Sequence, residues 1–228
     1  MPGTPYVVDD VMTRTVVALR DAAEFKDIAR TMRRHRISAL PVLDADGRVV
    51  GVVSEADLLP KEAFRDRDPA DARVPSPDGF GLVKARAVTA GELMTSPAVT
   101  VAANATLAQA ARLMARHRVK RLPVVDGEGV LKGIVSRSDL LDVFLRGDED
   151  IAADVCHEIA AHLLAVPVRP IGVEVHDGVV TLTGHVRDTT LVPLVVRLVR
   201  AVEGVVDVNC ELEGPLRRPN LDPDLPAR

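Results

Sequence analysis

Two Ser-x-x-Asp sequences, Ser54 to Asp57 and Ser136 to Asp139, hold the residues of this chain best placed to do chemistry. Each puts a hydroxyl and a carboxylate three positions apart where an apolar helical stretch begins. The free N–H groups of a helix N-terminus favour anions, and a carboxylate accepts hydrogen bonds from hydroxyl groups. The same spacing is close to a capping box with Asp in place of Glu, in which both residues only stabilise the helix. The two roles are compatible, and the sequence leaves the choice open.

Basic residues near the second of these sequences form a candidate phosphate site. Lys120 and Arg121 precede a Leu-Pro-Val sequence, whereas Ser38 and Ala39 precede the corresponding Leu-Pro-Val at 40–42. Arginine holds a phosphate with a planar fork of donors, and lysine acts as a point charge. We therefore predict that the site with Lys120 and Arg121 favours phosphorylated ligands, and that the other binds weakly or prefers a less charged ligand. The alternative is a solvated strand edge, where such cations are common.

Two arginines, Arg36 and Arg118, each stand at the end of a predicted helix. Cations are favoured at helix C-termini for electrostatic reasons alone, and this explains most of the basic residues there. Arg36 and Arg118 remain candidate ligand contacts.

The sequence offers no comparable set of residues for catalysis or for a metal ion. His157 and His162 resemble the two histidines of a zinc-protease helix, but they are five residues apart instead of four. At about 100° per residue, the extra step turns the second side chain away from the first. A phosphate-binding glycine loop, a dinucleotide fingerprint and a nucleophile elbow are also missing. We therefore expect neither an enzyme nor a metal site.

An internal repeat organises the first two thirds of the chain. Residues 37–59 and 119–141 align without a gap, and the same offset of 82 positions carries Met12 onto Met94. Met-Thr, Arg-His-Arg, Leu-Pro-Val, a glycine and Ser-x-x-Asp recur in one register. Self-similarity of this extent indicates two copies of one structural unit.

Each copy has the same predicted order of elements, β-α-β-β-α. Apolar positions three and four residues apart predict the first helix, and Asp-Gly or Glu-Gly turns separate two short apolar strands. The predicted strands are 15–19, 40–43 and 49–53 in the first copy, and 98–101, 122–125 and 131–135 in the second.

These repeats resemble CBS domains, which occur in pairs that pack sheet against sheet. The matching residues are Val-Met-Thr at 11–13, Leu-Met-Thr at 93–95, both Leu-Pro-Val sequences, and Gly-x-Val-Ser-x-x-Asp at the end of each copy. The resemblance covers about residues 7–145. It implies an α+β fold in which two repeats form one CBS-pair module, a homodimer of such modules, and a cleft between the repeats that holds an adenosine derivative.

The resemblance also implies roles for individual residues. Asp57 and Asp139 would accept hydrogen bonds from ribose hydroxyls, with Ser54 and Ser136 beside the ribose or the phosphate. The side chains implied to form an apolar slot for adenine are Pro41, Pro123, Val17 and Val99. The family often has Thr where this chain has Ser, which keeps the hydroxyl. The implied regulatory ligand is AMP, ADP, ATP or S-adenosylmethionine.

The segment between the repeats, residues 60–87, contains four prolines. Because proline disrupts helices and strands, we predict a long surface loop here, with room for a short helical piece near 61–67. Such a loop is either a lid or partner contact, or a plain spacer.

Residues 149–213 do not continue the repeat. Apolar spacing predicts helices at 150–164 and 188–202. Asp-Gly at 177–178 predicts a hairpin, and a last strand follows residue 204, which gives the order α-β-β-α-β. Pro193 either lies in the first turn of the second helix or breaks that helix. The predicted hairpin strands are 172–175 and 179–182.

This segment resembles a BON domain, through Val-x-Val at 173–175, the sequence 177–184, and Gly-Val at 204–205 followed by Val208. Members of that family outside the cytosol are associated with envelopes and phospholipid. Residues 149–213, however, carry 11 acidic and 4 basic side chains, and anionic lipid repels such a surface. We expect protein contacts for this domain, with binding to phospholipid or a membrane surface as the alternative.

The predicted organisation is CBS repeat one at 7–59, a linker loop at 60–87, CBS repeat two at 88–146, a BON-like domain at 149–213 and a flexible tail at 214–228. The N-terminus has no basic-then-apolar signal, and no run of about 18 apolar residues occurs, so we expect a cytoplasmic protein. Aromatic residues make up only 2% of the chain, which disfavours a surface that stacks exposed bases.

Taken with the resemblance, these features predict a regulatory module that senses an adenine nucleotide or S-adenosylmethionine. Ligand in the CBS-pair cleft would change the packing of the pair, and a protein partner would respond to the change. The alternative is a constitutive interaction scaffold whose clefts stay empty.

Overall fold

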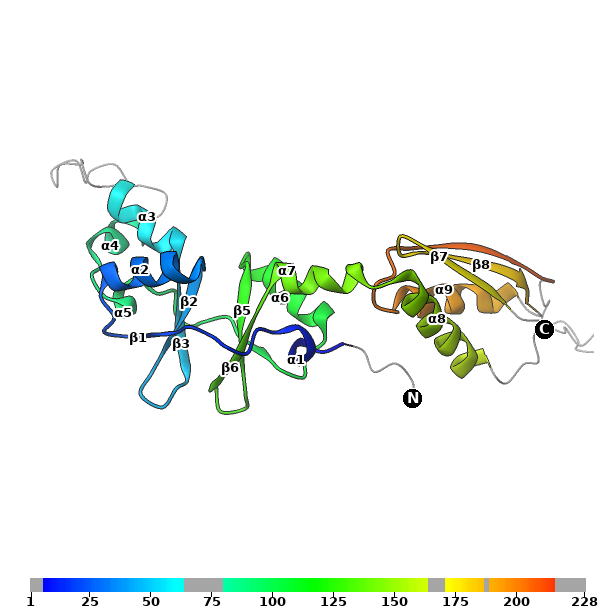
Figure 1. Ribbon diagram of the computed structural model, residues 1–228, viewed down its shortest axis with the longest axis horizontal. Helices are drawn as coiled ribbons and strands as arrows, with labels where there is room; N and C mark the ends of the chain where they lie inside the picture. The colour runs from blue at the N-terminus through cyan, green and yellow to red at the C-terminus, as the bar shows by residue number, and fades with distance from the viewer. Residues whose placement is uncertain (1–5, 64–79, 164–170, 187–188, 216–228) are drawn as a thin grey trace, which may run out of the picture. The chain divides into compact units, whose positions relative to one another are not determined.

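The computed structural model describes residues 6–63, 80–163, 171–186 and 189–215, which belong to two compact units. The repeat unit, Val7–Leu140, contains both sequence repeats (Figure 1). The C-terminal unit consists of Tyr6 and the described chain from Leu141 onward. Each unit has its own buried apolar core.

The repeat unit holds two three-stranded sheets of the same design. In each, a two-residue first strand runs parallel to the second strand, and the second and third strands form an antiparallel hairpin. The predicted β-α-β-β-α order is confirmed. The first repeat comprises β1 (Leu19–Arg20), α2 (Phe25–His35), β2 (Ala39–Leu43), β3 (Val49–Ser54) and α3 (Glu55–Ala63). The second comprises β4 (Val101–Ala102), α6 (Leu107–His117), β5 (Arg121–Val125), β6 (Leu131–Ser136) and α7 (Arg137–Leu141).

The first strand of each repeat is shorter than the sequence predicts. The expected strand 15–19 is reduced to β1, which begins where Leu19 pairs with Val42 of β2. β4 likewise begins at Val101 instead of 98. In the unpaired part of each predicted strand, Val17 and Val99 pack against the core of their own repeat, so their apolar character reflects core packing without a strand ladder.

The segment that leads into each repeat packs against the core of the other repeat. α1 (Val8–Val11) contributes to the core of the second repeat, beside Leu122 and Val135. α5 (Ala90–Leu93) contributes to the core of the first, beside Leu40 and Val53. Each packing unit therefore combines residues from both sequence repeats.

Backbone bridges and a methionine–glycine contact hold these leading segments in place. Thr95 and Val52 exchange two hydrogen bonds, with N···O distances of 2.9 and 3.1 Å. Next to this pair, a Cβ added at Gly51 would collide with the Met94 sulfur. The same arrangement recurs 82 positions away with Thr13, Ile134, Met12 and Gly133. The Met-Thr and glycine motifs are thus two halves of one contact between repeats.

Helical structure replaces both described ends of the predicted linker loop. At the first end it overlaps the helical piece expected near 61–67, and at the second end the loop prediction is wrong. α3 continues through Pro60 to Ala63, and α4 (Phe80–Arg86) precedes the second repeat. The rest of the linker, 64–79, lies outside the described residues. α3 and α4 pack against each other.

Tertiary contacts explain why Pro60 does not end α3. Lys61 donates a hydrogen bond to the Ala87 carbonyl at 2.6 Å, and its ammonium lies 4.8 Å from the centre of the Phe25 ring. A proline inside a helix is unfavourable by about 3 kcal/mol, which packing of this kind can offset. Composition alone does not reveal such contacts.

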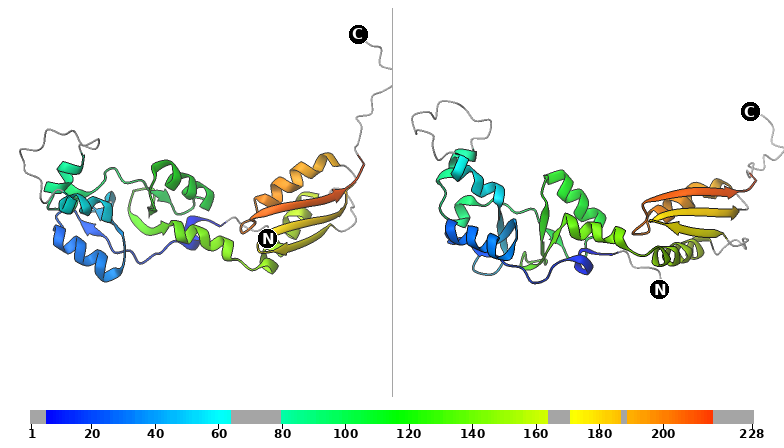
Figure 2. Two further views of the ribbon diagram at one scale, coloured as in Figure 1. Left: turned by 90° about the horizontal axis from the view of Figure 1, so that it is seen from above. Right: turned by 45° about the horizontal axis from the view of Figure 1, so that its top comes forward.

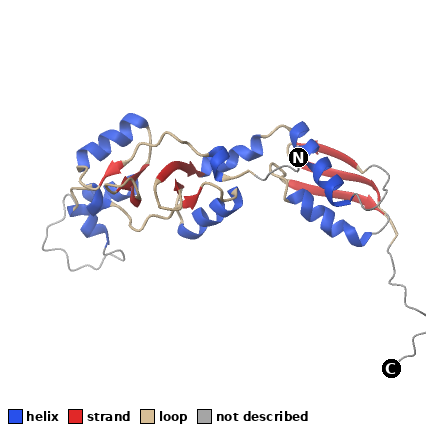
Figure 3. Ribbon diagram, turned by 90° about the horizontal axis from the view of Figure 1, so that it is seen from below, coloured by secondary structure: helices blue, strands red, loops and turns tan. Residues whose placement is uncertain are grey.

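The C-terminal unit is one three-stranded sheet with both helices on the same face (Figures 2 and 3). Its antiparallel hairpin and parallel third strand confirm the predicted α-β-β-α-β order. The elements are α8 (Asp148–Leu163), β7 (Gly172–His176), β8 (Val179–His185), α9 (Val192–Arg200) and β9 (Asp207–Glu213).

Two local features set the limits of these elements. α9 begins at Val192 and has Pro193 in its first turn, which is the first of the two predicted alternatives and shortens the expected helix 188–202. In the β7–β8 hairpin, Asp177 and Gly178 both have positive φ, and their N–H groups donate to the Asp148 carboxylate at 2.9 Å. The first residue of α8 therefore fixes the turn.

Candidate ligand-binding cleft

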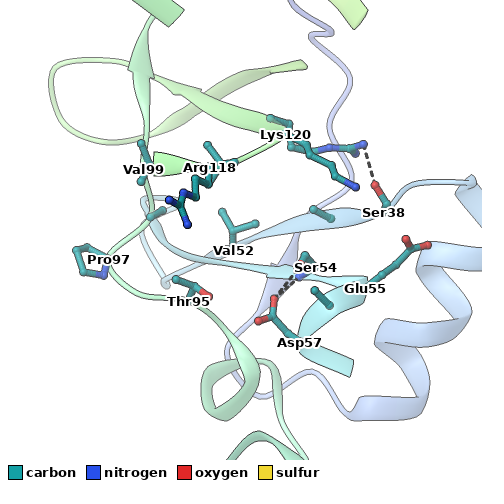
Figure 4. A pocket seen from close by; sticks show the side chains of 15 residues that line it. Ser38, Val52, Ser54, Glu55, Asp57, Thr95, Pro97, Val99, Arg118 and Lys120 are labelled. Carbon is teal, nitrogen blue, oxygen red and sulfur yellow. Dashed lines mark hydrogen bonds between the residues drawn. The ribbon is translucent and has the colours of Figure 1, made fainter. Parts of the chain in front are cut away.

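A pocket of about 290 Å³ lies between the two repeats of the repeat unit (Figure 4). One wall comes from the end of β3 and the start of α3. The other comes from the segment before β4 and from the turn between α6 and β5. The volume is near the lower end of the roughly 300–1,000 Å³ typical of small-molecule sites.

The crossing of the leading segments explains why both repeats line this pocket. Thr95 forms a bridge with Val52 of β3, which lies two residues before Ser54. The chain that follows Thr95 therefore starts beside the end of β3. This places Pro97 and Val99 in the same pocket as Ser54 and Asp57. The first repeat's Ser-x-x-Asp and the segment before β4 of the second repeat are therefore close in space although they are far apart in the sequence.

Half of the predicted ligand-binding residues meet here. They are Ser54, Asp57, Val99, Arg118, Lys120 and Arg121. Asp57 lies on one side of the pocket, while Arg118 and Lys120 extend from the opposite side (Figure 4).

Lys120 and Arg121 share a pocket with the first Ser-x-x-Asp, because the cleft combines the two repeats. Arg121 also pairs with Ser136 in the β5–β6 ladder, so it lies beside the second Ser-x-x-Asp as well. Arg121 is also less available than expected: it is half-buried and donates from Nη2 to Ser38 Oγ at 2.9 Å. Its Nε is buried without a hydrogen-bond partner among the described residues.

Asp57 is buried, with 8% of its surface exposed, and both of its carboxylate oxygens are engaged. Oδ2 accepts hydrogen bonds from the backbone N–H of Ser54 at 2.7 Å and from its hydroxyl at 2.8 Å. Oδ1 forms an ion pair with Lys84 of α4. The carboxylate is thus positioned by the helix start and by a lysine that sequence reasoning missed.

The second Ser-x-x-Asp is built in a related but looser way. The Ser136 N–H donates to Asp139 Oδ2 at 2.7 Å, and the Asp139 N–H reaches Ser136 Oγ at 3.5 Å. This is the reciprocal pattern of a capping box, so the helix-capping role predicted for these residues is present. Asp139 is half-buried.

The remaining predicted residues lie elsewhere in the repeat unit. Pro41 and Pro123 are buried within β2 and β5, and Val17 packs against the core of the first repeat. Arg36 lies in a separate groove between α2 and α3. The apolar side chains that line the pocket include Val52 and Pro97 in place of the two prolines.

Val17, Arg36, Ser136 and Asp139 are the 82-position counterparts of Val99, Arg118, Ser54 and Asp57. The Thr13–Ile134 bridge relates them in the same way as the Thr95–Val52 bridge relates the first set. The pseudo-symmetric counterpart of the pocket is therefore the region around Ser136 and Asp139. We call the pocket with Asp57 the first cleft and the region with Asp139 the second cleft.

Left-handed C-caps turn the chain toward these clefts. Arg36 ends α2 with φ +54°, and Arg118 ends α6 with φ +55°. Glycine is the usual residue at such a position, because other residues are strained there. An arginine kept in this conformation points to a role for its side chain.

Neither a metal centre nor a membrane span emerges from the described parts of the chain. Their histidines, cysteines and carboxylates form no group of three or more that could hold a metal ion. Their helices include none with the length and apolar character needed to cross a bilayer.

Both units match known domain families. The CBS domain family matches residues 8–62 and 90–146, and the BON domain family matches residues 147–214. Over 159 residues the chain is 31% identical to an uncharacterized protein of Methanocaldococcus jannaschii, covering 63% of this chain and 94% of that protein. It is 29% identical to CBSX2, a chloroplastic CBS domain-containing protein of Arabidopsis thaliana, over 62% of this chain and 64% of CBSX2.

Solved structures share the architecture of the repeat unit. A crystal structure of CBSX2 in complex with AMP has a TM-score of 0.54 and 30% identity, covering 61% of this chain and 97% of that one. The CBS domain pair of protein MJ0100, in complex with 5′-methylthioadenosine and S-adenosyl-L-methionine, has a TM-score of 0.50 at 20% identity, over 62% and 97% of the two chains. At 20% identity, the similarity to the MJ0100 structure supports the fold alone. The chain belongs to the CBS-domain family, with two CBS repeats followed by a C-terminal BON domain.

Proposed function

We propose that the CBS pair is a regulatory module that binds an adenine nucleotide in the first cleft. The observation that carries the proposal is the arrangement of the pocket, in which Asp57 faces Arg118 and Lys120 with Val52 between them (Figure 4). A carboxylate suits ribose hydroxyls, cations suit a phosphate, and apolar side chains suit an adenine ring. The structure of CBSX2 with AMP supports the same ligand class here.

The first cleft carries three cations, which suits a phosphorylated ligand. Arg118, Lys120 and Arg121 line it, and so do Ser38 and Ala39, the 82-position counterparts of Lys120 and Arg121. We propose that AMP, ADP or ATP occupies the first cleft. The second cleft binds weakly or takes a less charged ligand such as S-adenosylmethionine.

A thermal-shift screen tests the proposal. The purified chain is heated with AMP, ADP, ATP, GTP and S-adenosylmethionine, alongside Asp57→Ala and Asp139→Ala variants. A ligand that binds only the folded protein raises the melting temperature, by several degrees at concentrations far above Kd. We expect a shift with an adenine nucleotide that Asp57→Ala abolishes. An unchanged AMP affinity after Lys120→Ala with Arg121→Ala would contradict the phosphate role.

A constitutive scaffold is the second candidate, and one observation favours it. Both oxygens of Asp57 already have partners within the protein, as in a purely structural helix start. The scaffold predicts no shift with any of these ligands at millimolar concentration.

We propose a homodimer formed through the CBS pairs. Leu59 and Leu141, 82 positions apart on the final helices of the two repeats, are 66% and 60% exposed. Exposed leucines at equivalent positions supply apolar surface for a contact between copies. Light scattering after size exclusion is expected to give the mass of a dimer, and Leu59→Asp to shift it toward a monomer.

For the BON domain we propose protein contacts. Glu174, Glu211 and Glu213 on β7 and β9 are exposed, and a surface with these carboxylates is repelled by anionic lipid. Strong co-sedimentation of the chain with phosphatidylserine vesicles would favour the phospholipid alternative.

A further inference from the structure

Lys84 is the charged group closest to the functional carboxylate of the first cleft, and it lies outside both repeats' sequence motifs. Its ammonium pairs with Asp57 Oδ1 and donates to Thr95 Oγ1 at 3.3 Å. The two side chains are only 18% and 11% exposed. A charge-assisted contact this far from water is among the stronger polar interactions in a protein.

The ion pair has a direct consequence for a nucleoside in this cleft. Asp57 Oδ2 already accepts two hydrogen bonds from Ser54, so a ribose diol has to take Oδ1. Lys84 occupies that oxygen. The diol therefore displaces the ammonium, and a mostly buried ammonium without an anionic partner is strongly unfavourable.

A phosphorylated nucleoside supplies the missing partner. Its phosphate is one ribose ring away from the diol, within reach of a flexible lysine side chain that already contacts Thr95 at the pocket. Lysine binds phosphate as a mobile point charge, so it can exchange one anion for the other. Adenosine, which lacks the phosphate, offers no such exchange.

We propose that Lys84 is a specificity-determining residue of the first cleft: it leaves Asp57 when a ribose binds there and pairs with the phosphate of the same ligand. The inference rests on the proposed function. It makes the first cleft selective for phosphorylated over unphosphorylated adenosine, beyond the attraction that Arg118 and Lys120 provide.

The second cleft lacks this device in the described part of the chain. Asp139 is bonded to Ser136 there and forms no ion pair with a lysine among the described residues. The two clefts therefore differ in the state of their carboxylate.

The test is calorimetric titration of the full chain with AMP and with adenosine. Every protein compared carries Asp139→Ala, so that the titration measures binding to the first cleft alone. The background protein is compared with Lys84→Met, with Lys84→Arg, which keeps the charge, and with the control Lys61→Met, whose lysine bonds the Ala87 carbonyl instead of Asp57. Thermal unfolding shows that each variant is folded.

Lys84→Met is expected to lower the ratio of AMP affinity to adenosine affinity by about tenfold, since AMP loses one charge-assisted contact and adenosine no longer displaces a lysine. Lys84→Arg and Lys61→Met are expected to keep the ratio. An unchanged ratio in folded Lys84→Met, with AMP still bound, overturns the inference and leaves the proposed function standing. No binding of either ligand by the background protein and by the wild type overturns both.

Discussion

Arg118 both ends a helix and lines the first cleft. Its left-handed backbone is unfavourable for any side chain with a Cβ, and it ends α6 where the chain turns into the first cleft. Arg36 has the same backbone conformation but lies in a different groove. Comparing variants of Arg118 and Arg36 therefore distinguishes the cost of the left-handed backbone from an effect on ligand binding.

We predict that Arg118→Gly and Arg36→Gly each stabilise the folded chain by about 0.5–1 kcal/mol, because glycine relieves the strain and only part of the gain is lost to unfolded-state entropy. Urea unfolding measures this change. Only Arg118→Gly is expected to weaken AMP binding. Equal loss of AMP affinity in both variants would contradict the assignment of Arg118 to the first cleft.

Only some of the side chains around the first cleft could be predicted from the sequence. Ser54, Asp57, Arg118 and Lys120 could be selected because their motif is local and recurs. Lys84 could not, because it lies in a proline-rich segment read as a loop, and only the packing of α4 against α3 brings it to Asp57.

At the scale of elements, the contact between each leading segment and the other repeat is the central packing feature. Gly51 allows Met94 to lie against β3, and Gly133 does the same for Met12. The order of elements could be predicted from local periodicity. The crossing could not, since it depends on which of two similar sheets each segment joins.

We predict that Gly51→Ala destabilises the repeat unit by about 1–3 kcal/mol, because the added methyl group overpacks against the Met94 sulfur. Gly127→Ala is the matched control, since nothing lies within 4 Å of a Cβ at that turn position. Denaturant midpoints measure both. Similar stability of the two variants would contradict the close contact.

The capping box of α5 gives a pH-dependent prediction. Glu92 accepts hydrogen bonds from the Val88 and Thr89 N–H groups, which lower its pKa from the ordinary value of a glutamate. Since the folded pKa lies below the unfolded one, the carboxylate stabilises the fold above the unfolded value, and this contribution disappears as pH falls through the folded pKa.

We therefore predict that Glu92→Gln lowers the melting temperature at pH 7 and that the difference from wild type vanishes in acid. Gln109 holds the same place in the capping box of α6 without a titrating group. The effect of Gln109→Ala is expected to be independent of pH. A constant Glu92→Gln difference between pH 7 and acid pH would contradict the role of the carboxylate.

At the scale of the whole molecule, the chain consists of two separately packed units. The first cleft lies entirely within Val7–Leu140, so ligand binding needs no residue of the BON domain. The BON domain has its own core around Ile151, Leu182 and Val199 and contributes a separate acidic surface. Both families could be recognised from the sequence, because their motifs are short and local.

The central claim is that the first cleft binds an adenine nucleotide through Asp57. Titration of AMP by calorimetry into the wild-type chain, Asp57→Asn and Asp139→Asn tests it most directly. We predict that Asp57→Asn loses at least about tenfold in AMP affinity, since the amide replaces a charged acceptor, while Asp139→Asn binds AMP as the wild type does. Equal AMP affinity in Asp57→Asn and wild type, or a loss confined to Asp139→Asn, would contradict the account.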